Sequence, residues 1–410
     1  MKILYFCPQR VWPLTGGALL RNFHLANALA ARCSVTLLQL SRPNEKATET
    51  WPETKFGQVL TFERDSAYTI RKILSGIAGP LPLTVLNYAS QNVASALSAL
   101  LTKESFDAVQ LESVHLLSYL DVIRKSANRP AVVADWHNVE SELMARYASR
   151  TRNPAKRLVA YRTAQLLKQA EQRLLSEAAV HLVVSERERL LLQERAPHAE
   201  VHVVPNGVDN AAFEQVAAGR IGSGNSSRKS VLFVGSMDYH ANVDAVTWFA
   251  REIWPRIASQ FPELVFTIAG RNPGPGVRAL ASANIQVTGS VDDVRPYYAN
   301  AAAVVVPLRV GSGTRLKILE AMAAGVPVVS TTLGAEGLDV KDGVQLLIGD
   351  APEEISSALV RLLQDPVRAR TLTDSAKTMV CAQYDWPLIG EQLYEIHRKL
   401  YVRTHSVTHF

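Results

Sequence analysis

The stretch GSGTRLKILEAMAAGVPVVST, residues 311–331, contains the pattern that decides the fold. It predicts a helix that begins near Thr314 and ends at Gly325, because glycine is favoured just beyond the last helical residue. The apolar run Val326–Val329 then predicts a short buried strand. A helix followed by a buried strand is the repeating unit of an α/β fold with a parallel sheet.

The same alternation of short apolar strands and amphipathic helices runs outward from this stretch in both directions. The predicted strands are Lys2–Cys7, Cys33–Leu40, Phe106–Leu111, Ala131–Ala134, Val180–Val184, Val201–Val204, Ser230–Val234, Leu264–Ala269, Ile285–Thr288 and Ala302–Pro307. Such a pattern predicts parallel sheets covered by helices on both faces. Ligands of these folds bind outside the carboxyl ends of the strands or in a cleft between domains.

The length of 410 residues favours two domains, since a single hydrophobic core rarely grows that large. The polar run GRIGSGNSSRK at 219–229 is the best boundary candidate. We expect an N-terminal domain over 1–212, a linker over 213–229 and a C-terminal domain over 230–386. A last helix over about 387–402 is a candidate to pack back on the first domain.

Composition restricts the class of protein. Apolar residues make up 47% of the chain, which is typical of a globular protein, and the net charge is +6. No signal peptide and no run of about 18 apolar residues is found, so we expect a cytoplasmic protein. The three cysteines lack metal-binding or redox spacing. The charge fits an anionic small molecule or membrane surface, whereas nucleic acid is disfavoured because the basic residues do not interleave with aromatics.

Two features break the rules for an ordinary helix. Arg315 and Lys317 lie at the helix start, although the positive end of a helix dipole favours anions. Gly311 and Gly313 precede them and let backbone N–H groups approach a ligand, so a phosphate or diphosphate would complete the site. The alternative is that both cations face solvent. Glu320, within an apolar run, either accepts hydrogen bonds from sugar hydroxyls or pairs with Lys317.

Several segments together resemble the retaining family 4 glycosyltransferases of GT-B fold. They are GGALLRNFHLANALA (16–30), VVPNGVD (203–209), LFVGSMDYHANVDAVTWF (232–249), TIAGRNP (267–273), VTGSVDDVRPYYANAAAVVVPL (287–308) and the run from Pro307 to Leu338. The resemblance implies an α/β protein with two Rossmann-like domains, parallel sheets and an interdomain cleft. It also implies transfer of a hexosyl or related group from a nucleotide-diphosphate sugar to a glycan or lipid-linked acceptor, with retention of anomeric configuration.

The resemblance also assigns residues. Family members carry two carboxylates eight positions apart beside the donor; Glu320 matches the second, which typically binds the ribose, whereas the first falls on Ser312. The predicted donor-binding residues are Gly16, Gly17, Asp238, Asn242, Gly311, Ser312, Gly313, Thr314, Glu320 and Glu336. For Gly16 and Gly17 a plain turn is the alternative.

The predicted catalytic residues are Arg315, Lys317 and His137. The family's usual Arg after the second domain's first strand falls near Ser236, and its partner Lys near Ala241 or Asn242. We infer that Arg315 and Lys317 supply the missing charge, as in a subgroup with the signature GSGTRxK. His137 matches the family's acceptor-side histidine, with a structural histidine as the alternative. No Asp-x-Asp motif is present, so no metal and no other cofactor is expected.

One basic segment, 146–173, has eight Lys or Arg residues and a single acid. Its apolar residues suit one face of a helix: Leu158, Tyr161, Ala164 or Gln165, Leu167 and Leu174. The segment is either a solvated helix that covers the sheet or a surface for anionic lipid, at the inner membrane face, or for a phosphate-bearing acceptor. Two other functions stay open for the whole chain: a nucleotide-sugar epimerase on the same fold, and a sugar-binding protein without catalysis.

Overall fold

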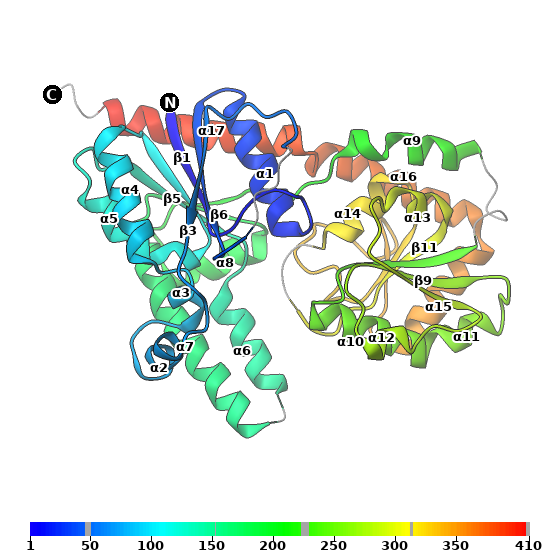
Figure 1. The fold of residues 1–410 in the computed structure, drawn as a ribbon. Helices are drawn as coiled ribbons and strands as arrows, with labels where there is room; N and C mark the ends of the chain where they lie inside the picture. Colours follow the sequence, from blue (N-terminus) through cyan, green and yellow to red (C-terminus); the bar gives the residue numbers. More distant parts are fainter. Residues whose placement is uncertain (46–50, 152, 223–228, 312–314, 407–410) are drawn as a thin grey trace. The chain divides into compact units, whose positions relative to one another are not determined.

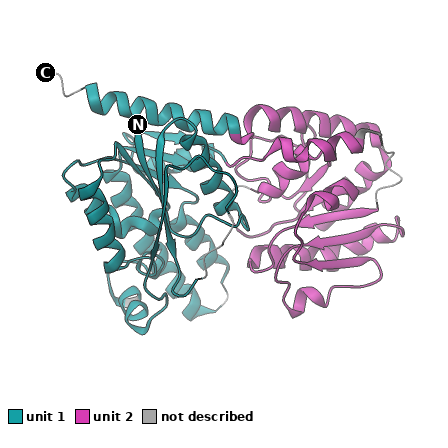
Figure 2. Cartoon of the chain, turned by 45° about the horizontal axis from the view of Figure 1, so that its top comes forward, with its two compact units in different colours: residues 1–205, 387–410 teal, residues 206–386 magenta. Residues whose placement is uncertain are grey.

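The computed structural model describes residues 1–45, 51–151, 153–222, 229–311 and 315–406 (Figure 1). The chain forms two compact units, one of residues 1–205 with 387–410 and one of residues 206–386 (Figure 2). Within the described ranges, none of the helices is both long and apolar enough to cross a membrane.

The first unit is built on a parallel sheet that lies between helices. Its strands are β1 (Lys2–Cys7), β2 (Ser34–Ser41), β3 (Gln58–Glu63), β4 (Ala108–Glu112), β5 (Ala131–Trp136), β6 (Val180–Val183) and β7 (Val201–Val203). Its helices are α1 (Gly17–Ala30), α2 (Ile70–Ala78), α3 (Leu83–Leu86), α4 (Gln91–Lys103), η1 (Val114–Tyr119), α5 (Leu120–Lys125), α6 (Glu140–Arg150), α7 (Pro154–Glu177), α8 (Glu186–Arg195) and α17 (Trp386–Ser406).

The register of the first sheet places polar side chains on one face. The strand order among the described residues is β3-β2-β1-β4-β5-β6-β7. Glu112 at the end of β4 is the register partner of Asp135 on β5. Register partners on parallel strands point to the same face, and so do residues two apart on one strand. Gln110, Glu112 and Asp135 therefore share one face near the carboxyl edge, and all three are fully buried.

The second unit repeats the architecture. Its strands are β8 (Ser230–Val234), β9 (Val265–Ala269), β10 (Ile285–Gly289), β11 (Ala301–Val306), β12 (Val328–Ser330) and β13 (Leu347–Ile348). Its helices are α9 (Asn210–Gly222), α10 (His240–Trp248), η3 (Phe249–Ile253), α11 (Trp254–Ala258), α12 (Pro275–Arg278), α13 (Arg295–Asn300), α14 (Leu316–Ala323), α15 (Pro352–Gln364) and α16 (Pro366–Gln383).

The second sheet is also parallel and is central to its core. In the part of the chain that the structure describes, the strand order is β10-β9-β8-β11-β12-β13. Strand β11, AAAVVV, is buried along its whole length. A continuous apolar strand of this kind is typical of a parallel sheet with both faces covered, as the sequence predicts.

The end of helix α14 confirms the predicted stop at Gly325. The backbone of Gly325 has a φ of 66°. Its N–H donates to Met322 O at 3.1 Å, and the N–H of Val326 donates to Ala321 O at 2.8 Å. These are the two closing bonds of a Schellman motif. The following strand begins at Val328 rather than Val326, because the Val326 N–H closes the helix and Pro327 has none to give.

The predicted linker over 213–229 is wrong for residues 213–222, which belong to helix α9 of the second unit. Arg220 holds this helix in place from a buried position. Its Nη1 donates to Tyr298 O at 3.0 Å and to Ala301 O at 2.7 Å, and its Nε donates to Gly325 O at 3.0 Å. Tertiary contacts therefore extend the helix into a stretch whose glycine and serine content favours a loop.

The basic segment 146–173 spans two helices, α6 and α7, rather than one. The predicted apolar face is wrong for the start of α7, where the side chain of Leu158 is 71% exposed and that of Tyr161 is 58% exposed. From Ala164 onward the predicted face is confirmed, since the buried residues of α7 include Ala164, Leu167 and Leu174. Helices α6 and α7 lie side by side, as Figure 1 shows.

Candidate active site

The predicted donor-binding residues of the second unit follow the carboxyl ends of its strands. Asp238 and Asn242 come after β8, Gly311 after β11, and Glu336 after β12. Strand β11 pairs with both β8 and β12, so these segments belong to one edge of the sheet. The predicted residues Ser312, Gly313 and Thr314 lie outside the described residues.

The Lys317 side chain extends from α14 to the first turn of α10, which follows β8. Its Nζ donates to Asn242 Oδ1 at 2.9 Å. Gly235 leaves room for this approach, since a Cβ at that position would lie 2.8 Å from Nζ. Burial and then the charge of Arg315 lower the pKa of Lys317 to about 7. An anion bound here would therefore draw a proton onto Lys317.

We expect the affinity for a nucleotide sugar to fall as pH rises above 7. Below pH 7 Lys317 is already charged in the free protein. Above pH 7 the free protein loses a proton that the complex keeps, so affinity falls by up to about tenfold per pH unit. Calorimetric titration from pH 6 to 9 measures this, because the diphosphate diester of a nucleotide sugar does not titrate in the range. Lys317→Arg is expected to flatten the profile; a flat wild-type profile would contradict the assignment.

Arg315 is the N-cap residue of α14 and is only 6% exposed. The alternative that it simply faces solvent is therefore wrong. Gly311 beside it has a φ of 108°, in the left-handed region. A Cβ at Gly311 would lie 2.7 Å from the Tyr239 hydroxyl and 3.5 Å from Arg315 Nη2. The glycine thus lets the chain turn closely past the guanidinium, and the first turn of α14 contains no acid, as the sequence indicates.

Glu320 is held by a residue that the sequence did not single out. The hydroxyl of Tyr298, on α13, donates to Glu320 Oε2 at 2.7 Å. Burial raises the pKa of Glu320, and the hydrogen bond from Tyr298 and the charge of Lys317 oppose this only in part. The expected alternative, an ion pair with Lys317, is not formed between these two described residues, because the Lys317 ammonium donates to Asn242.

The loop after β8 is organised by its own polar side chains. Asp238 is exposed and accepts from Asn272 Nδ2 at 2.8 Å and Ser236 Oγ at 3.1 Å. Asn242 is 7% exposed and donates from Nδ2 to Ser236 O at 2.8 Å. Glu336 is partly exposed after β12. Donor contact by Asp238, Asn242 and Glu336 stays a prediction.

In the first unit, His137 follows β5 and contacts a buried carboxylate. Its Nε2 lies 2.8 Å from Glu112 Oε2. Asn22 of α1, with its amide nitrogen facing Glu112 Oε2 at 2.9 Å, adds a further donor. Burial raises the pKa of Glu112, but the hydrogen bond and charge of His137, with the charge of Arg21, outweigh it and hold the pKa below its ordinary value. Glu112 is therefore an ionised acceptor for His137.

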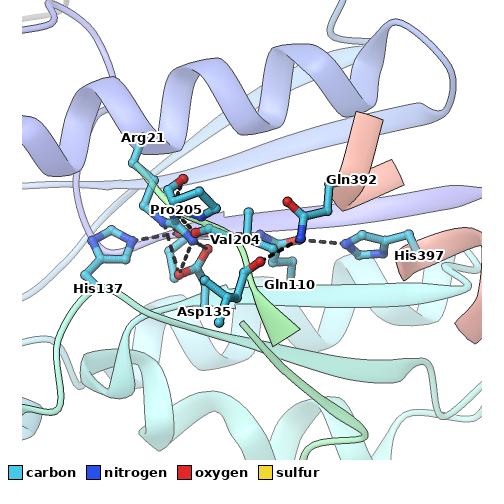
Figure 3. Close-up of polar contacts among 10 residues, drawn as sticks. Arg21, Gln110, Asp135, His137, Val204, Pro205, Gln392 and His397 are labelled. Atoms are coloured by element: carbon cyan, nitrogen blue, oxygen red, sulfur yellow. Dashed lines mark hydrogen bonds and ion pairs between the residues drawn. The ribbon is translucent and has the colours of Figure 1, made fainter. Parts of the chain in front are cut away.

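A fully buried ion pair lies beside this contact (Figure 3). Arg21 of α1 donates to both oxygens of Asp135, with Nη2 2.8 Å from Oδ2 and 3.0 Å from Oδ1. Its Nε lies 3.1 Å from Oδ2. Its Nη1 donates to Val204 O at 2.8 Å and to Pro205 O at 3.2 Å. Arg21 therefore joins α1, β5 and the chain beyond β7.

Glu112, Asp135 and His137 bring ligand atoms within 4.8 Å of one another, a spacing that could hold a metal ion. The guanidinium of Arg21, however, already takes both oxygens of Asp135. One oxygen of Glu112, Oε2, is already in contact with Nε2 of His137. The three residues therefore fit an ion-paired network better than a metal centre.

Comparisons with known proteins agree with this geometry. Residues 15–212 match the family described as "Glycosyltransferase Family 4". Residues 228–365 match the family described as "Glycosyl transferases group 1". The two families together match most of the chain.

The individual relatives of this chain are distant in sequence. Phosphatidyl-myo-inositol mannosyltransferase of Mycobacterium tuberculosis is 28% identical over 205 residues, which are 47% of this chain and 53% of the relative. The chain thus spans about half the length of the curated relatives it matches. Sucrose-phosphate synthase of Thermosynechococcus elongatus has a TM-score of 0.70 at 20% identity, over 98% of this chain and 100% of that one. Anabaena HepE in complex with UDP-glucose has a TM-score of 0.62 at 17% identity, over 97% and 100%. These likenesses show the GT-B fold.

The network of buried polar residues in the first unit was not predicted from the sequence. Gln110 and Glu112 are two residues apart at the end of the otherwise apolar strand β4. Asp135 is the last residue but one of the neighbouring strand β5. Polar residues with a period of two in a buried strand are a signal, because they point to one face. The signal does not name a partner, and Arg21 comes from a helix more than 100 residues earlier in the chain.

Gly16 provides a test that separates fold from ligand contact. Gly16 is the N-cap residue of α1, with an extended φ of −170°, and Gly17 is the first helical residue. A Cβ at Gly16 meets no atom within 4 Å. We expect Gly16→Ala to change the free energy of unfolding by less than about 1 kcal/mol. If a donor phosphate approaches this backbone, kcat/KM for sugar transfer falls by roughly tenfold or more.

The matched control for Gly16→Ala is Gly274→Ala. Gly274 is also a helix N-cap residue with open space around its Cβ position, and it was not predicted to contact the donor. It is expected to keep full activity. Equal kinetics for both variants would support a plain turn at Gly16.

Proposed function

We propose that the chain transfers a sugar from a nucleotide-diphosphate sugar to an acceptor hydroxyl, with retention of anomeric configuration. The observation that carries this proposal is the pair of cations at the start of α14. Arg315 is buried there, and Lys317 reaches from there to the loop after β8. Two cations at a helix N-terminus, next to a close-turning glycine, match the charge of a diphosphate.

The position of Lys317 supports the inferred exchange of charge between loops. The segment after β8, with Ser236 in the loop and Asn242 in the first turn of α10, is where the family resemblance implies basic residues. The Lys317 ammonium lies 2.9 Å from Asn242 Oδ1 and 3.9 Å from the centre of the Phe233 ring at the end of β8. The charge missing from this loop is thus supplied from α14.

The relatives are consistent with a nucleotide-sugar donor. Anabaena HepE, a structural neighbour, was solved with UDP-glucose. The mycobacterial relative is named as a mannosyltransferase acting on phosphatidyl-myo-inositol. We therefore place this chain in the synthesis of a bacterial surface polysaccharide or glycolipid, with a glycan or lipid-linked acceptor.

In the proposed reaction the bond between the anomeric carbon and the diphosphate oxygen breaks as the acceptor oxygen bonds to that carbon. The acceptor proton passes to the departing diphosphate, so no separate base is needed. Arg315 and Lys317 stabilise the charge that develops on the leaving group. Glu320 accepts hydrogen bonds from the ribose, and its carboxylate is oriented by Tyr298.

The proposal includes catalysis without a divalent ion. Arg315 and Lys317 provide the positive charge that a metal supplies in other transferases. Turnover in EDTA is therefore expected to equal turnover in buffer alone. A rate restored only by Mg²⁺ or Mn²⁺ would remove this part of the proposal.

Incubation with a panel of nucleotide sugars tests the proposed function. With acceptor present, a transferase releases the nucleoside diphosphate and forms a glycoside, whose anomeric configuration is read by NMR. An epimerase changes the sugar without acceptor, and a binding protein gives a thermal shift without turnover. Either of the last two outcomes would overturn the proposal.

We further propose that the tip of the α6–α7 hairpin contacts an anionic membrane. It exposes the apolar side chains of Tyr147, Leu158, Val159 and Tyr161. The exposed basic residues Arg150, Lys156, Arg157 and Arg162 lie on the same stretch. Apolar side chains among cations are typical of surfaces that enter the headgroup region of anionic bilayers.

Co-sedimentation with vesicles tests the membrane contact. Binding to vesicles of phosphatidylglycerol is expected, with little binding to phosphatidylcholine alone. The double substitution Leu158→Ser with Arg157→Gln should reduce the bound fraction several-fold. Val367→Ser, at a similarly exposed apolar residue of α16, is the matched control. Equal binding by wild type and double variant would overturn the assignment.

A further inference from the structure

A buried chain of hydrogen bonds runs from the C-terminal helix to His137 (Figure 3). His397 of α17 lies with Nε2 2.7 Å from Gln110 Oε1. Gln110 Nε2 donates to Glu112 Oε1 at 2.7 Å, and Glu112 Oε2 lies 2.8 Å from His137 Nε2. The first three residues are almost completely buried. The chain therefore joins α17, β4 and the end of β5 without passing through solvent.

The donors and acceptors of this chain have a single direction. An ionised Glu112 only accepts, so the amide nitrogen of Gln110 must face it and the amide oxygen must face His397. The Nε2 of His397 then carries the hydrogen. Burial lowers the pKa of His397 to about 4, so this imidazole is neutral at pH 7. At the other end, an ionised Glu112 accepts from Nε2 of His137, so in the neutral form of that imidazole Nδ1 is the nitrogen without a hydrogen.

The chain transmits orientation rather than protons. A carboxamide such as Gln110 does not relay a proton, because its nitrogen and oxygen have fixed donor and acceptor roles. What His397 determines is the rotation of the Gln110 amide. The amide in turn holds one oxygen of Glu112, and the second oxygen selects the tautomer of His137.

Helix α17, which carries the first residue of this series of hydrogen bonds, is fixed to the first unit by packing and by hydrogen bonds. Gly390 packs directly on Ala28 of α1, where any side chain at Gly390 would collide. Gln392 Nε2 donates to Val203 O at 2.7 Å, and Leu393 is fully buried one turn before His397. The position of His397 relative to β4 is therefore set by contacts on several elements of the first unit.

We propose that α17 positions His137 through His397, Gln110 and Glu112, so that Nδ1 of His137 is the nitrogen presented to the acceptor. His397, Gln110 and Glu112 are positioning residues, whereas His137 is the residue that contacts the acceptor. The acceptor contact rests on the proposed function; the orientation of His137 does not.

Imidazole NMR with selectively ¹⁵N-labelled histidine tests the orientation directly on the full chain. The signal of His137 is identified among those of the ten histidines because it is missing from the His137→Asn variant. Wild-type His137 is expected as the Nε2–H tautomer. In His397→Leu the second tautomer should appear at His137.

Rescue and packing controls separate positioning from general stability. His397→Gln retains an N–H donor toward Gln110 and should restore the wild-type tautomer. Leu393→Ala removes packing on the same helix without touching the chain, so it should lower the melting temperature and leave the tautomer unchanged. Gln110→Leu carries the same expectation as His397→Leu if the latter does not fold. An unchanged His137 tautomer in His397→Leu and Gln110→Leu overturns the proposal, as does a tautomer change in Leu393→Ala.

Turnover gives a second reading once a substrate pair is known. His397→Leu should lower kcat about tenfold with the donor KM unchanged, because only acceptor geometry is affected. If wild type transfers no sugar, the proposed function fails while the NMR result stands. If wild type is active and His397→Leu retains full kcat, the proposed function stands and the positioning role fails.

Discussion

Replacing Arg315 with alanine is expected to lower kcat for sugar transfer by about 10²–10³-fold and to remove most of the thermal shift caused by a nucleotide sugar. The guanidinium is buried at the N-cap of α14, so no mobile cation replaces it. The same change should move the pH profile of binding upward, because the charge of Arg315 holds the pKa of Lys317 down. Calorimetry from pH 6 to 9 measures the loss of binding and the shift in its pH profile.

The shift in pH profile is the part that misfolding cannot imitate. Arg256→Ala is the control, since Arg256 is half exposed and paired with Glu353 on other helices of the second unit. It should leave kcat, the thermal shift and the pH profile unchanged. An Arg315→Ala variant with a normal nucleotide-sugar thermal shift would falsify the phosphate assignment.

Replacing Asp135 with leucine is expected to lower the free energy of unfolding by about 3–5 kcal/mol. The change leaves the guanidinium of Arg21 buried without its carboxylate, and Arg21 has no neutral form to adopt. Arg21→Met should cost less, because burial raises the pKa of Asp135 to about 6 even with Arg21 present, and the orphaned carboxyl can take up a proton. Chemical denaturation of both variants measures the difference.

The two losses depend on pH in opposite ways. In Arg21→Met the pKa of Asp135 rises above its wild-type value of about 6, so the loss relative to wild type shrinks as pH falls to about 6 and is constant below it. In Asp135→Leu the loss should grow as pH falls from about 6 toward 4, because wild-type Asp135 takes up a proton on folding in that range and the variant has no such group. Arg398→Met, which breaks an exposed pair with Glu395, should leave the free energy of unfolding nearly unchanged at any pH. A loss below about 1 kcal/mol in Asp135→Leu would show that the pair contributes little.

The second unit could be predicted closely from the sequence. The stop at Gly325, the buried strand β11 and the basic start of α14 all depend on local rules: glycine conformation, apolar runs and charge near a helix end. The first element that these rules misplaced is α9, predicted as linker over 213–222. The contacts of Arg220 with four distant carbonyls decide that helix, and no local pattern contains them.

The site divides in the same way. Arg315, Lys317 and Glu320 lie within six residues of one another, so their shared helix brings them together without further information. Tyr298, which holds Glu320, comes from α13 and was not expected. His137 was expected from the resemblance, but its carboxylate partner Glu112 comes from the neighbouring strand and was not.

By itself the sequence determined the α/β class, the number of sheets and the position of the basic helix start, because each depends on residues near one another in the chain. The tertiary structure alone decided which buried charges meet. Arg21 and Asp135 are 114 positions apart, and His397 and Gln110 are 287 apart. Buried polar groups must find partners wherever the fold brings them, and strand register and helix seating, not spacing along the chain, choose those partners.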